Sequence, residues 1–534
     1  MAITKNIVKK GLFRDSVQMM LLSQELRKDE GVLDAAIVMG TSLNKDVLLR
    51  CGLLTNEGVN AGEADTVISL TCKDERSLKS ALERAEGLLT QNPSQGKTDF
   101  QTIESALGSL AGANLAALSI PGQYVKEVAS KMIERKMHIF LFSDHVPLAD
   151  EVELKRSALA HNLLFMGPEA GTSIINGTVL GFGNRVRKGN VGIIGASGTG
   201  IQESSILLHF CGSGITNAIG VGGRDMKEQV GGLMTLKTMA FFEEDPETDA
   251  ILIVSKPVSP SIRNKIIDAV RKYSKKDYIL CLIGDQEQLY DYKQIKFAKS
   301  IQAAVLKTLK TIDRRRFESS QHKLKQETSM CLEFANESSR SLGSKQKFAR
   351  GLFTGGTLCY ESKVILEEML GPTFSNLSSS PKYHIGGNEA SKAHTLIDFG
   401  EDEFTASRPH PIIDPSLRLE RLLKEARDPS VAVIFMDLIV GYSVAERTIE
   451  LHSKAIKEAI ESAGKENRTL PIFVHVCGTE QDISEADLDV IREAGAQIFT
   501  SNALMSITAA AIIKKQKPDA MRSILSDYLG DDIK

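Results

Sequence analysis

The chain has 534 residues, 42% of them hydrophobic and 25% charged, which is typical of a soluble protein with several globular domains. Its net charge of −3 and its lack of tryptophan argue against nucleic acid or an acidic membrane surface as a partner. No signal peptide and no run of ~18 apolar residues is found, so we expect a cytoplasmic protein.

The seven cysteines are odd in number and form no CxxC pair, which argues against a disulfide framework or a zinc knuckle. We expect them to be small, mostly buried side chains in a reducing compartment. The sequence also shows no spacing of ligand residues typical of a metal site, so none is predicted.

Residues 1–188 are predicted to form a first domain in which apolar runs alternate with helical patterns. Expected strands are 5–10, 35–39, 66–70, 114–120, 138–142 and 163–166, and expected helices are 16–27, 77–89 and 124–135. Alternation of this kind predicts a mostly parallel sheet with helices on both faces. Residues 91–98 are expected to be a surface loop.

Two further domains are predicted over residues 189–306 and 349–534, joined by a charged, partly helical linker over 307–348. Their expected strands are 191–195, 216–221, 250–255 and 278–283 in one, and 350–354, 395–399, 431–436, 471–476 and 496–500 in the other. The last twenty residues are polar, and we expect them to be frayed.

A glycine-rich turn recurs at equivalent places in these two domains. Gly195-Ala-Ser-Gly-Thr199 follows one apolar strand, and Phe353-Thr-Gly-Gly-Thr357 follows another, with a glutamate four residues after each threonine. A strand, a glycine-rich turn and a helix together point backbone N–H groups at an anion. The repeat indicates an internal duplication and predicts anion binding by the residues of both turns, namely Ser197, Gly198, Thr199, Gly355, Gly356 and Thr357.

Residues 115–285 resemble the α subunit of succinyl-CoA synthetase, and the third domain resembles the ligase domain of its β subunit. The first resemblance rests on Gly167-Pro168, Lys188 to Ile194, Ser197 to Glu203, Gly220 to Gly223 and Glu244 to Leu252. The second rests on Leu396-Ile-Asp-Phe-Gly400 and Asp428 to Gly441. The predicted fold class is therefore α/β: a Rossmann-like CoA-binding-type domain, then two duplicated flavodoxin-like ligase domains.

Nearly the whole chain resembles the FdrA proteins, one branch of the acyl-CoA synthetase superfamily. The motifs that carry this resemblance are Lys9 to Val17, Phe142-Ser-Asp144, Gly222-Gly-Arg-Asp225, Gly351 to Thr357 and Ser407 to Pro415. FdrA proteins are linked to oxamate carbamoyltransferase, which exchanges oxalurate and phosphate for oxamate and carbamoyl phosphate in allantoin and purine breakdown. The resemblance implies an oligomeric protein that works with companion subunits.

The chain departs from succinyl-CoA synthetase where that enzyme carries its phosphorylated histidine. Residues 284–291 stand at the matching place, and no histidine occurs between His209 and His322. The glycine-rich CoA-phosphate loop, a Walker A motif and an ATP-grasp module are also missing from the sequence. These departures favour carbamoyl transfer, which needs no cofactor, over nucleotide-driven thioester synthesis.

Three more residues are candidates for the site. Arg408 precedes Pro409, and His410 lies between Pro409 and Pro411, which fix the backbone around it; a histidine can donate a proton near neutral pH. Arg224 follows a strand end and could hold a carboxylate or phosphate, although a surface arginine fits equally well. His475 and Cys477 are expected to be core and strand-end residues, and Asp414 and Asp437 could hold the arginines or a metal.

Two other functions stay open. One is an NDP-forming acyl-CoA synthetase, an acid–thiol ligase that binds CoA and needs a separate ATP-grasp subunit. The other is a non-catalytic regulator that binds CoA or an anion.

Overall fold

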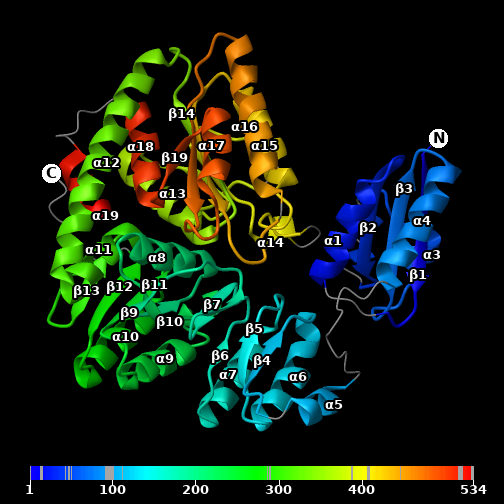
Figure 1. Ribbon diagram of the computed structural model, residues 1–534, viewed down its shortest axis with the longest axis horizontal. Helices are drawn as coiled ribbons and strands as arrows, with labels where there is room; N and C mark the ends of the chain where they lie inside the picture. The colour runs from blue at the N-terminus through cyan, green and yellow to red at the C-terminus, as the bar shows by residue number, and fades with distance from the viewer. Residues whose placement is uncertain are drawn as a thin grey trace. The chain divides into compact units, whose positions relative to one another are not determined.

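The computed structural model describes residues 2–12, 16–41, 44–45, 48–49, 51–90, 102–110, 112–285, 287, 290–386, 389–405, 409–445, 447–514 and 521–530. The loop expected at 91–98 lies outside these residues. The chain divides into two compact units, and each is described by itself (Figure 1). One unit comprises residues 1–113 with 402–409, and the other comprises 114–401 and 410–534.

The N-terminal unit is built on one antiparallel sheet with the strand order β1-β3-β2. The prediction of a parallel sheet is wrong for this part of the chain. The third strand lies between the first two and runs antiparallel to both. The alternation of strands and helices in the sequence does not reveal the direction of a strand. The elements of this unit are β1 (Ile3–Lys9), α1 (Ser16–Arg27), β2 (Val32–Met39), α3 (Asn56–Val59), β3 (Thr66–Cys72), α4 (Glu75–Thr90), α5 (Ile103–Ser109) and α14 (Asp402–Thr405).

The sheet of this unit has apolar residues on both faces. One face packs with α1 and α4 around a cluster that includes Leu26, Ile37 and Leu70. The other face packs Val67 against Leu53 and its neighbours. The continuous burial of β3 explains why its sequence reads as an apolar run without alternation.

The second unit opens with a small parallel sheet, β4-β5-β6, and a hairpin, β7-β8. Residues 1–188, which the sequence assigns to one domain, thus contain two separate sheets, one antiparallel and one parallel. The domain boundaries at 188, 306 and 348 remain predictions from the sequence. The elements are β4 (Leu115–Leu118), α6 (Gly122–Glu134), β5 (His138–Leu141), α7 (Leu148–Ala160), β6 (Phe165–Met166), β7 (Thr172–Ile175) and β8 (Thr178–Gly181).

The first ligase-like domain is a doubly wound sheet with the order β13-β12-β11-β9-β10, extended at the β10 edge by the hairpin β7-β8. Its five core strands are parallel. The elements are β9 (Lys188–Gly195), α8 (Gly198–Phe210), β10 (Ile215–Gly220), η1 (Gly223–Met226), α9 (Leu233–Glu244), β11 (Ala250–Ser255), α10 (Pro260–Tyr273), β12 (Asp277–Leu282), β13 (Ile295–Ala298) and α11 (Ile301–Ile312).

The second ligase-like domain repeats this order as β19-β18-β17-β14-β16, with β15 added at the edge. All of its strand pairs are parallel. The elements are β14 (Phe348–Phe353), α13 (Gly356–Leu370), β15 (Phe374–Ser375), β16 (Thr395–Asp398), α15 (Ser416–Ala426), β17 (Val431–Ile439), α16 (Thr448–Lys465), β18 (Ile472–Cys477), α17 (Glu485–Glu493), β19 (Gln497–Phe499) and α18 (Asn502–Lys514).

When the five core strands of each domain are numbered in chain order, without β7, β8 and β15, both sheets have the order 2-1-3-4-5, which is the flavodoxin-like arrangement. The predicted duplication and α/β fold class are therefore confirmed. Ligands of such sheets bind beyond the carboxyl ends of the strands, next to the first one. The glycine turns follow β9 and β14, the first strand of each domain.

The helices after the two turns lie at the junction of the duplicated domains (Figure 1). In α8 every side chain from Thr199 to His209 is buried, and α18 is buried from Asn502 to Ile512. Burial of a helix on all of its faces is typical of such an interior position. The two domains therefore share one core.

The predicted linker is mostly a single helix, α12 (Arg314–Ser341), which buries Phe317, Leu324 and Leu332 at helical spacing. The expectation of a frayed C-terminus is wrong for α19 (Arg522–Leu529), where Tyr528 and Leu529 are buried. Residues 515–520 and 531–534 lie outside the described part.

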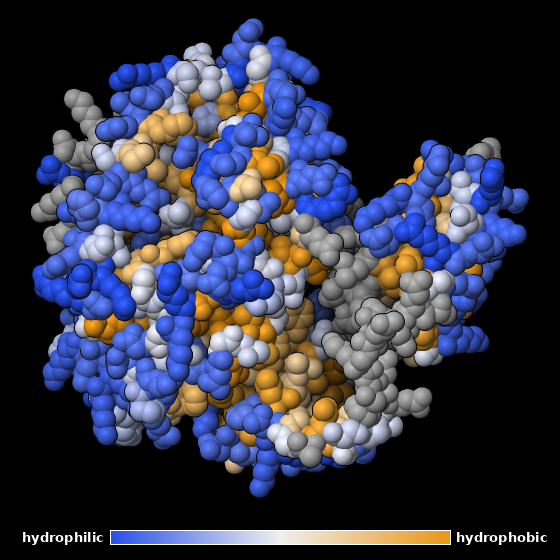
Figure 2. Space-filling view, viewed as in Figure 1, coloured by the Kyte–Doolittle hydropathy of each residue, from blue (hydrophilic) through white to orange (hydrophobic). Residues whose placement is uncertain are grey.

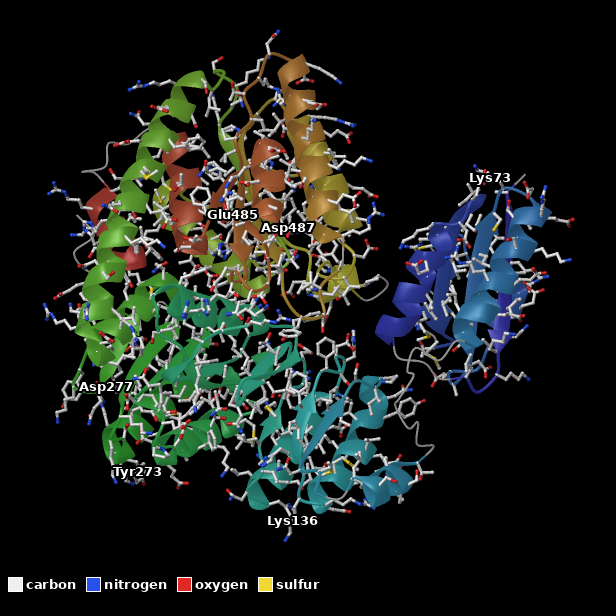
Figure 3. All side chains as sticks on the ribbon, viewed as in Figure 1. Lys73, Lys136, Tyr273, Asp277, Glu485 and Asp487 are labelled. Carbon is white, nitrogen blue, oxygen red and sulfur yellow. The ribbon has the colours of Figure 1, made fainter. Side chains whose placement is uncertain are left out.

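Hydrophilic residues predominate over the outer helices α12 and α16 (Figure 2). The charged start of α17 is typical of this exterior: Ser484 and Asp487 form a capping box, and Glu485 lies beside them (Figure 3). Among the helices the structure describes, none is both long and apolar enough to cross a membrane.

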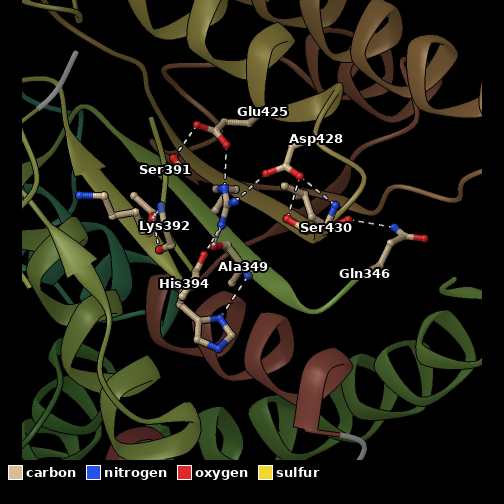
Figure 4. A network of polar contacts seen from close by, with 12 residues as sticks. Gln346, Ala349, Ser391, Lys392, His394, Glu425, Asp428 and Ser430 are labelled. Atoms are coloured by element: carbon tan, nitrogen blue, oxygen red, sulfur yellow. Dashed lines mark hydrogen bonds and ion pairs between the residues drawn. The ribbon is translucent and has the colours of Figure 1, made fainter. Parts of the chain in front are cut away.

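A buried polar network fastens the amino end of β14 (Figure 4). The Arg350 guanidinium lies 2.6 Å from a Glu425 oxygen and 3.0 Å from an Asp428 oxygen. The Ser391 hydroxyl donates to Glu425 at 2.6 Å. Because Arg350 is 1% exposed, these partners offset the cost of burying its charge. The network anchors the strand at the end opposite the glycine turn.

Candidate anion site at the paired glycine turns

The two predicted turns interlock. The Thr357 hydroxyl donates a hydrogen bond of 2.5 Å to the Ser197 Oγ, which also accepts the Gly200 N–H at 3.5 Å. A Cβ on Gly355 would lie 2.8 Å from the Thr199 Cγ2, closer than real contacts allow. Glycine is therefore needed where one turn packs on the other. We call residues 195–199 and 354–357 together the paired turns.

Both turns open a helix at the carboxyl end of a strand. Ser197 is the N-cap of α8, and Gly355 is the N-cap of α13. The first amides of a helix have no partner within the helix, and the helix end carries about half a positive charge. Two such ends converge here, which favours an anion between or beside them.

Asp437, at the end of β17, organises the second turn. Its carboxylate accepts the Thr354 N–H at 2.8 Å and the Gly355 N–H at 2.7 Å. Arg418 lies 2.7 Å from the same carboxylate, and both side chains are buried. The sequence proposed Asp437 as a partner for the candidate arginines or for a metal, whereas the structure pairs it with Arg418. The amides of Gly356 and Thr357 lie beyond this carboxylate in the first turn of α13.

A second carboxyl group, Asp398, ends β16 beside the second turn. Its Oδ1 accepts the Gly400 N–H at 2.8 Å. A Cβ on Gly356 would lie 2.6 Å from the Asp398 Oδ2 and 3.4 Å from the Lys256 Nζ, so this glycine lets both groups reach the start of α13. Burial, followed by the charge of Glu401, raises the pKa of Asp398 to about 8. A neutral carboxylic acid beside a helix N-terminus can donate a hydrogen bond to an oxyanion.

The predicted catalytic residue His410 lies beside Gly400. Its Nε2 would be 2.8 Å from a Cβ on Gly400, and its ring is 6.1 Å from that of Phe182. The Nδ1 accepts the Ile412 N–H at 3.3 Å, which assigns the ring proton to Nε2. Burial and then Arg418 lower the pKa of His410 to about 4, so the ring is neutral at pH 7. Arg408, the other predicted catalytic residue, lies outside the described residues.

Arg224, predicted to bind substrate, has an internal partner. Its Nε lies 2.8 Å from a carboxylate oxygen of Glu151. Glu151 and Asp225 each lie 2.9 Å from the Lys155 ammonium, and all three are fully buried. A Cβ on the adjacent Gly223 would lie 3.5 Å from the Ala196 carbonyl of the first turn. Substrate binding by Arg224 stays a prediction.

The two glutamates that follow the turns cap helices of the opposite domain. The Glu203 carboxylate accepts the Asn502 N–H of α18 at 3.2 Å, and the Glu361 carboxylate accepts the Ile301 N–H of α11 at 2.8 Å. The Asn502 side chain also donates to Glu361 at 2.8 Å. This crossed arrangement ties the two domains together and aligns the turns.

His475 is buried in β18, with its Nε2 2.7 Å from Glu203 and its Nδ1 3.2 Å from the Phe499 carbonyl. Burial opposes its charge, but the Glu203 carboxylate and its hydrogen bond outweigh burial, and the pKa of His475 is raised. Cys477 completes the one group of potential metal ligands found among the described residues. The geometry of the histidine and glutamate is that of a buried ion pair.

Four residues that lie in or beside the paired turns were not named as site residues from the sequence: Thr172, Lys256, Thr354 and Asp398. The hydroxyls of Thr172 and Thr354 are buried without a hydrogen-bond partner. Thr172 Oγ1 would lie 3.1 Å from a Cβ on Gly198, at the start of α8. Orphaned buried hydroxyls are uncommon and are consistent with a polar ligand. Lys256 directly follows β11 and Asp398 is the last residue of β16, and this position at a strand end is the signal that could have found them.

Three family profiles match the chain: residues 1–105 match "AllF, heavy metal-associated domain", 186–276 match "CoA binding domain" and 352–512 match "CoA-ligase". The CoA-binding match thus falls on the first ligase-like domain, whereas the sequence assigned a CoA-binding-type domain to 1–188. Residues 1–105 contain no histidine and only two cysteines, Cys51 and Cys72. Cys51 is exposed and Cys72 is buried in the core, so they do not fit a heavy-metal site.

Among related proteins, YahF of Escherichia coli K12 is 37% identical over 515 residues, which cover 96% of this chain and 99% of that protein. The α subunit of ADP-forming succinate–CoA ligase from Staphylococcus epidermidis is 26% identical over 166 residues, 30% of this chain and 53% of that subunit. A dinucleotide-forming acetyl-coenzyme A synthetase 1 from Ca. Korarchaeum cryptofilum superposes with a TM-score of 0.32 at 17% identity, covering 82% of this chain and 90% of that one. The chain belongs to the family of YahF, with an AllF-type N-terminal domain followed by CoA-binding and CoA-ligase domains of the succinyl-CoA synthetase type.

Proposed function

We propose that this protein is a subunit of an oxamate carbamoyltransferase in allantoin and purine nitrogen catabolism, and that the paired turns bind phosphate. The enzyme would exchange oxalurate and phosphate for oxamate and carbamoyl phosphate. The resemblance to FdrA proteins suggests this reaction, and the AllF-type N-terminal domain and the similarity to YahF are compatible with it. Companion subunits and an oligomeric assembly are part of the proposal.

The observation that carries the proposal is the convergence of two helix N-termini on hydroxyl groups. The amides that open α8 and α13, the Ser197–Thr357 hydroxyl pair and the Lys256 ammonium supply donors and positive charge. A tetrahedral dianion with several acceptor oxygens suits such a set. Arg224 and Arg408 remain candidates for the substrate carboxylate.

The reaction needs only these binding elements and a proton transfer. A phosphate oxygen attacks the carbamoyl carbon of oxalurate, and the bond from that carbon to the oxamate nitrogen breaks. The nitrogen takes up the proton that phosphate loses, so atoms and charge balance without a nucleotide. Donors placed at the developing oxyanion stabilise the tetrahedral intermediate. In this proposal His410, with its proton on Nε2, donates a hydrogen bond during that step.

The decisive assay is phosphorolysis of oxalurate by the purified chain, alone and with its co-expressed genetic neighbours. We expect carbamoyl phosphate only in a combination that contains this chain. Thr357→Val should lower the rate by roughly tenfold, because it removes the hydroxyl that links the turns. No carbamoyl phosphate in any combination would refute the reaction.

The CoA-binding and CoA-ligase matches favour a second candidate, an NDP-forming acyl-CoA synthetase with a separate ATP-grasp subunit. Against it stands the missing histidine between His209 and His322, which leaves no phosphohistidine relay in the matching region. Calorimetry with CoA distinguishes the two, because carbamoyl transfer needs no CoA. Micromolar CoA binding together with nucleotide-dependent thioester formation would favour this second function.

A further inference from the structure

We propose that Asp398 takes part in phosphate binding as a neutral carboxylic acid that donates a hydrogen bond to the anion, with Lys256 beside it supplying positive charge. This inference rests on the phosphate site proposed above and names the group that makes the site sensitive to pH.

The geometry places both groups at the opening turn of α13. Gly356 has no side chain, and the space that its Cβ would fill is open to two polar groups. The Asp398 Oδ2 lies 2.6 Å and the Lys256 Nζ 3.4 Å from the position that this Cβ would occupy. The Asp398 Oδ1 is held by the Gly400 N–H, which leaves Oδ2 as the oxygen that faces the turn. A ligand bound to the first amides of α13 therefore has both groups within reach.

A second observation points to a ligand at this turn. The Thr354 hydroxyl, in the residue that precedes the N-cap, is 2% exposed and has no hydrogen-bond partner. The Thr172 hydroxyl has the same property at the start of α8. An ordinary capped helix start leaves no buried donor of this kind.

An ionised Asp398 would repel phosphate, so its protonation state is critical. The charged groups around Asp398 determine that state. Asp437 faces it from β17 and is already paired with Arg418 of α15. Glu401 faces it from the next loop, 3.6 Å from Lys256. Burial and these negative neighbours raise the pKa of Asp398 to about 8, so the acid keeps its proton at neutral pH.

The remaining neighbours do not titrate near neutral pH. His410 is neutral because burial lowers its pKa to about 4, and burial raises the pKa of the Cys359 thiol well above its ordinary value. Asp398 therefore controls the pH response of this turn. A protonated carboxyl and an ammonium both donate to a phosphate oxygen.

The test is phosphate binding to the full-length chain across pH, by calorimetry with inorganic phosphate. We expect the affinity of the wild type to fall by up to tenfold for each pH unit above about 8. Asp398→Asn mimics the neutral acid and should bind phosphate without this fall. The ionisation of phosphate itself is common to both proteins and cancels in the comparison. Asp268→Asn, an exposed residue of α10, is the matched control and should behave as the wild type.

The outcomes separate the inference from the proposed function. A folded Asp398→Asn protein that no longer binds phosphate, or one that keeps the wild-type pH response, overturns the inference while the phosphate site stands. Absence of phosphate binding in the wild type overturns both. An Asp398-dependent pH response without any carbamoyl phosphate in the transfer assay supports the inference and refutes the carbamoyl reaction alone. Lys256→Met should weaken binding by roughly tenfold or more at every pH, since it removes a charged donor.

Discussion

The stability of the protein should depend on pH through Glu361, the buried glutamate of α13 that caps α11. Burial raises its pKa from 4.5 to about 7, even though hydrogen bonds from Asn502 and the Ile301 amide favour the ionised form. Between those two values the folded state keeps a proton that the unfolded chain has released. The stabilising contribution is therefore complete below about pH 4.5 and is lost as the pH rises to about 7.

The magnitude follows from the difference between the two pKa values. At about 1.4 kcal/mol for each pH unit, the change from 4.5 to about 7 corresponds to about 3 kcal/mol of unfolding free energy. Glu361→Gln removes the titration and keeps the shape of the side chain. Its amide can still accept the Ile301 N–H, provided that Asn502 turns its own amide over.

The measurement is urea unfolding followed by far-UV circular dichroism, since the chain has no tryptophan to report by fluorescence. The stability of the wild type relative to Glu361→Gln should fall by about 3 kcal/mol from acidic to neutral pH. Glu461→Gln, an exposed position of α16, is the control and should track the wild type. A difference between the wild type and Glu361→Gln that stays constant over this range would refute the reasoning.

Three further outcomes are expected. Arg418→Met leaves the Asp437 carboxylate buried without its cation and should cost roughly 3–5 kcal/mol in urea unfolding; a cost below about 1 kcal/mol would show that the pair is not needed. Gly356→Ala places a Cβ 2.6 Å from the Asp398 oxygen and should abolish phosphate binding, and unchanged calorimetry would contradict the packing of the turn. A thiol reagent should modify the exposed Cys51 before the other six cysteines, which peptide mapping by mass spectrometry checks.

The duplication could be predicted from the sequence because its signals are local. A strand, a glycine turn and a helix occupy one continuous stretch, so Gly195 to Thr199 and Phe353 to Thr357 are visible by spacing alone. The strand positions of both ligase-like domains followed in the same way from short apolar runs, except for the core strand β13 and the edge strand β15, which the sequence did not indicate. The seven cysteines, read as unpaired from their spacing, form no disulfide.

Pairing between distant segments was not visible. The antiparallel insertion of β3 between β1 and β2 depends on which strand edges meet, and the alternation of strands and helices is the same for either direction. The helix at 522–529 reads as a polar tail, because its few apolar residues become meaningful only once α11 provides a surface for them.

The sequence by itself therefore determined the two glycine turns, their duplication and the α/β fold class. Only the tertiary structure decided that the turns interlock. It also decided that the carboxylate of Asp437, 83 residues from Thr354 in the chain, accepts a backbone N–H of the second turn. It also decided that Asp398 and Lys256 meet over Gly356. Local spacing encodes a turn, whereas the charge beside it comes from the ends of other strands, which only the folded sheets bring together.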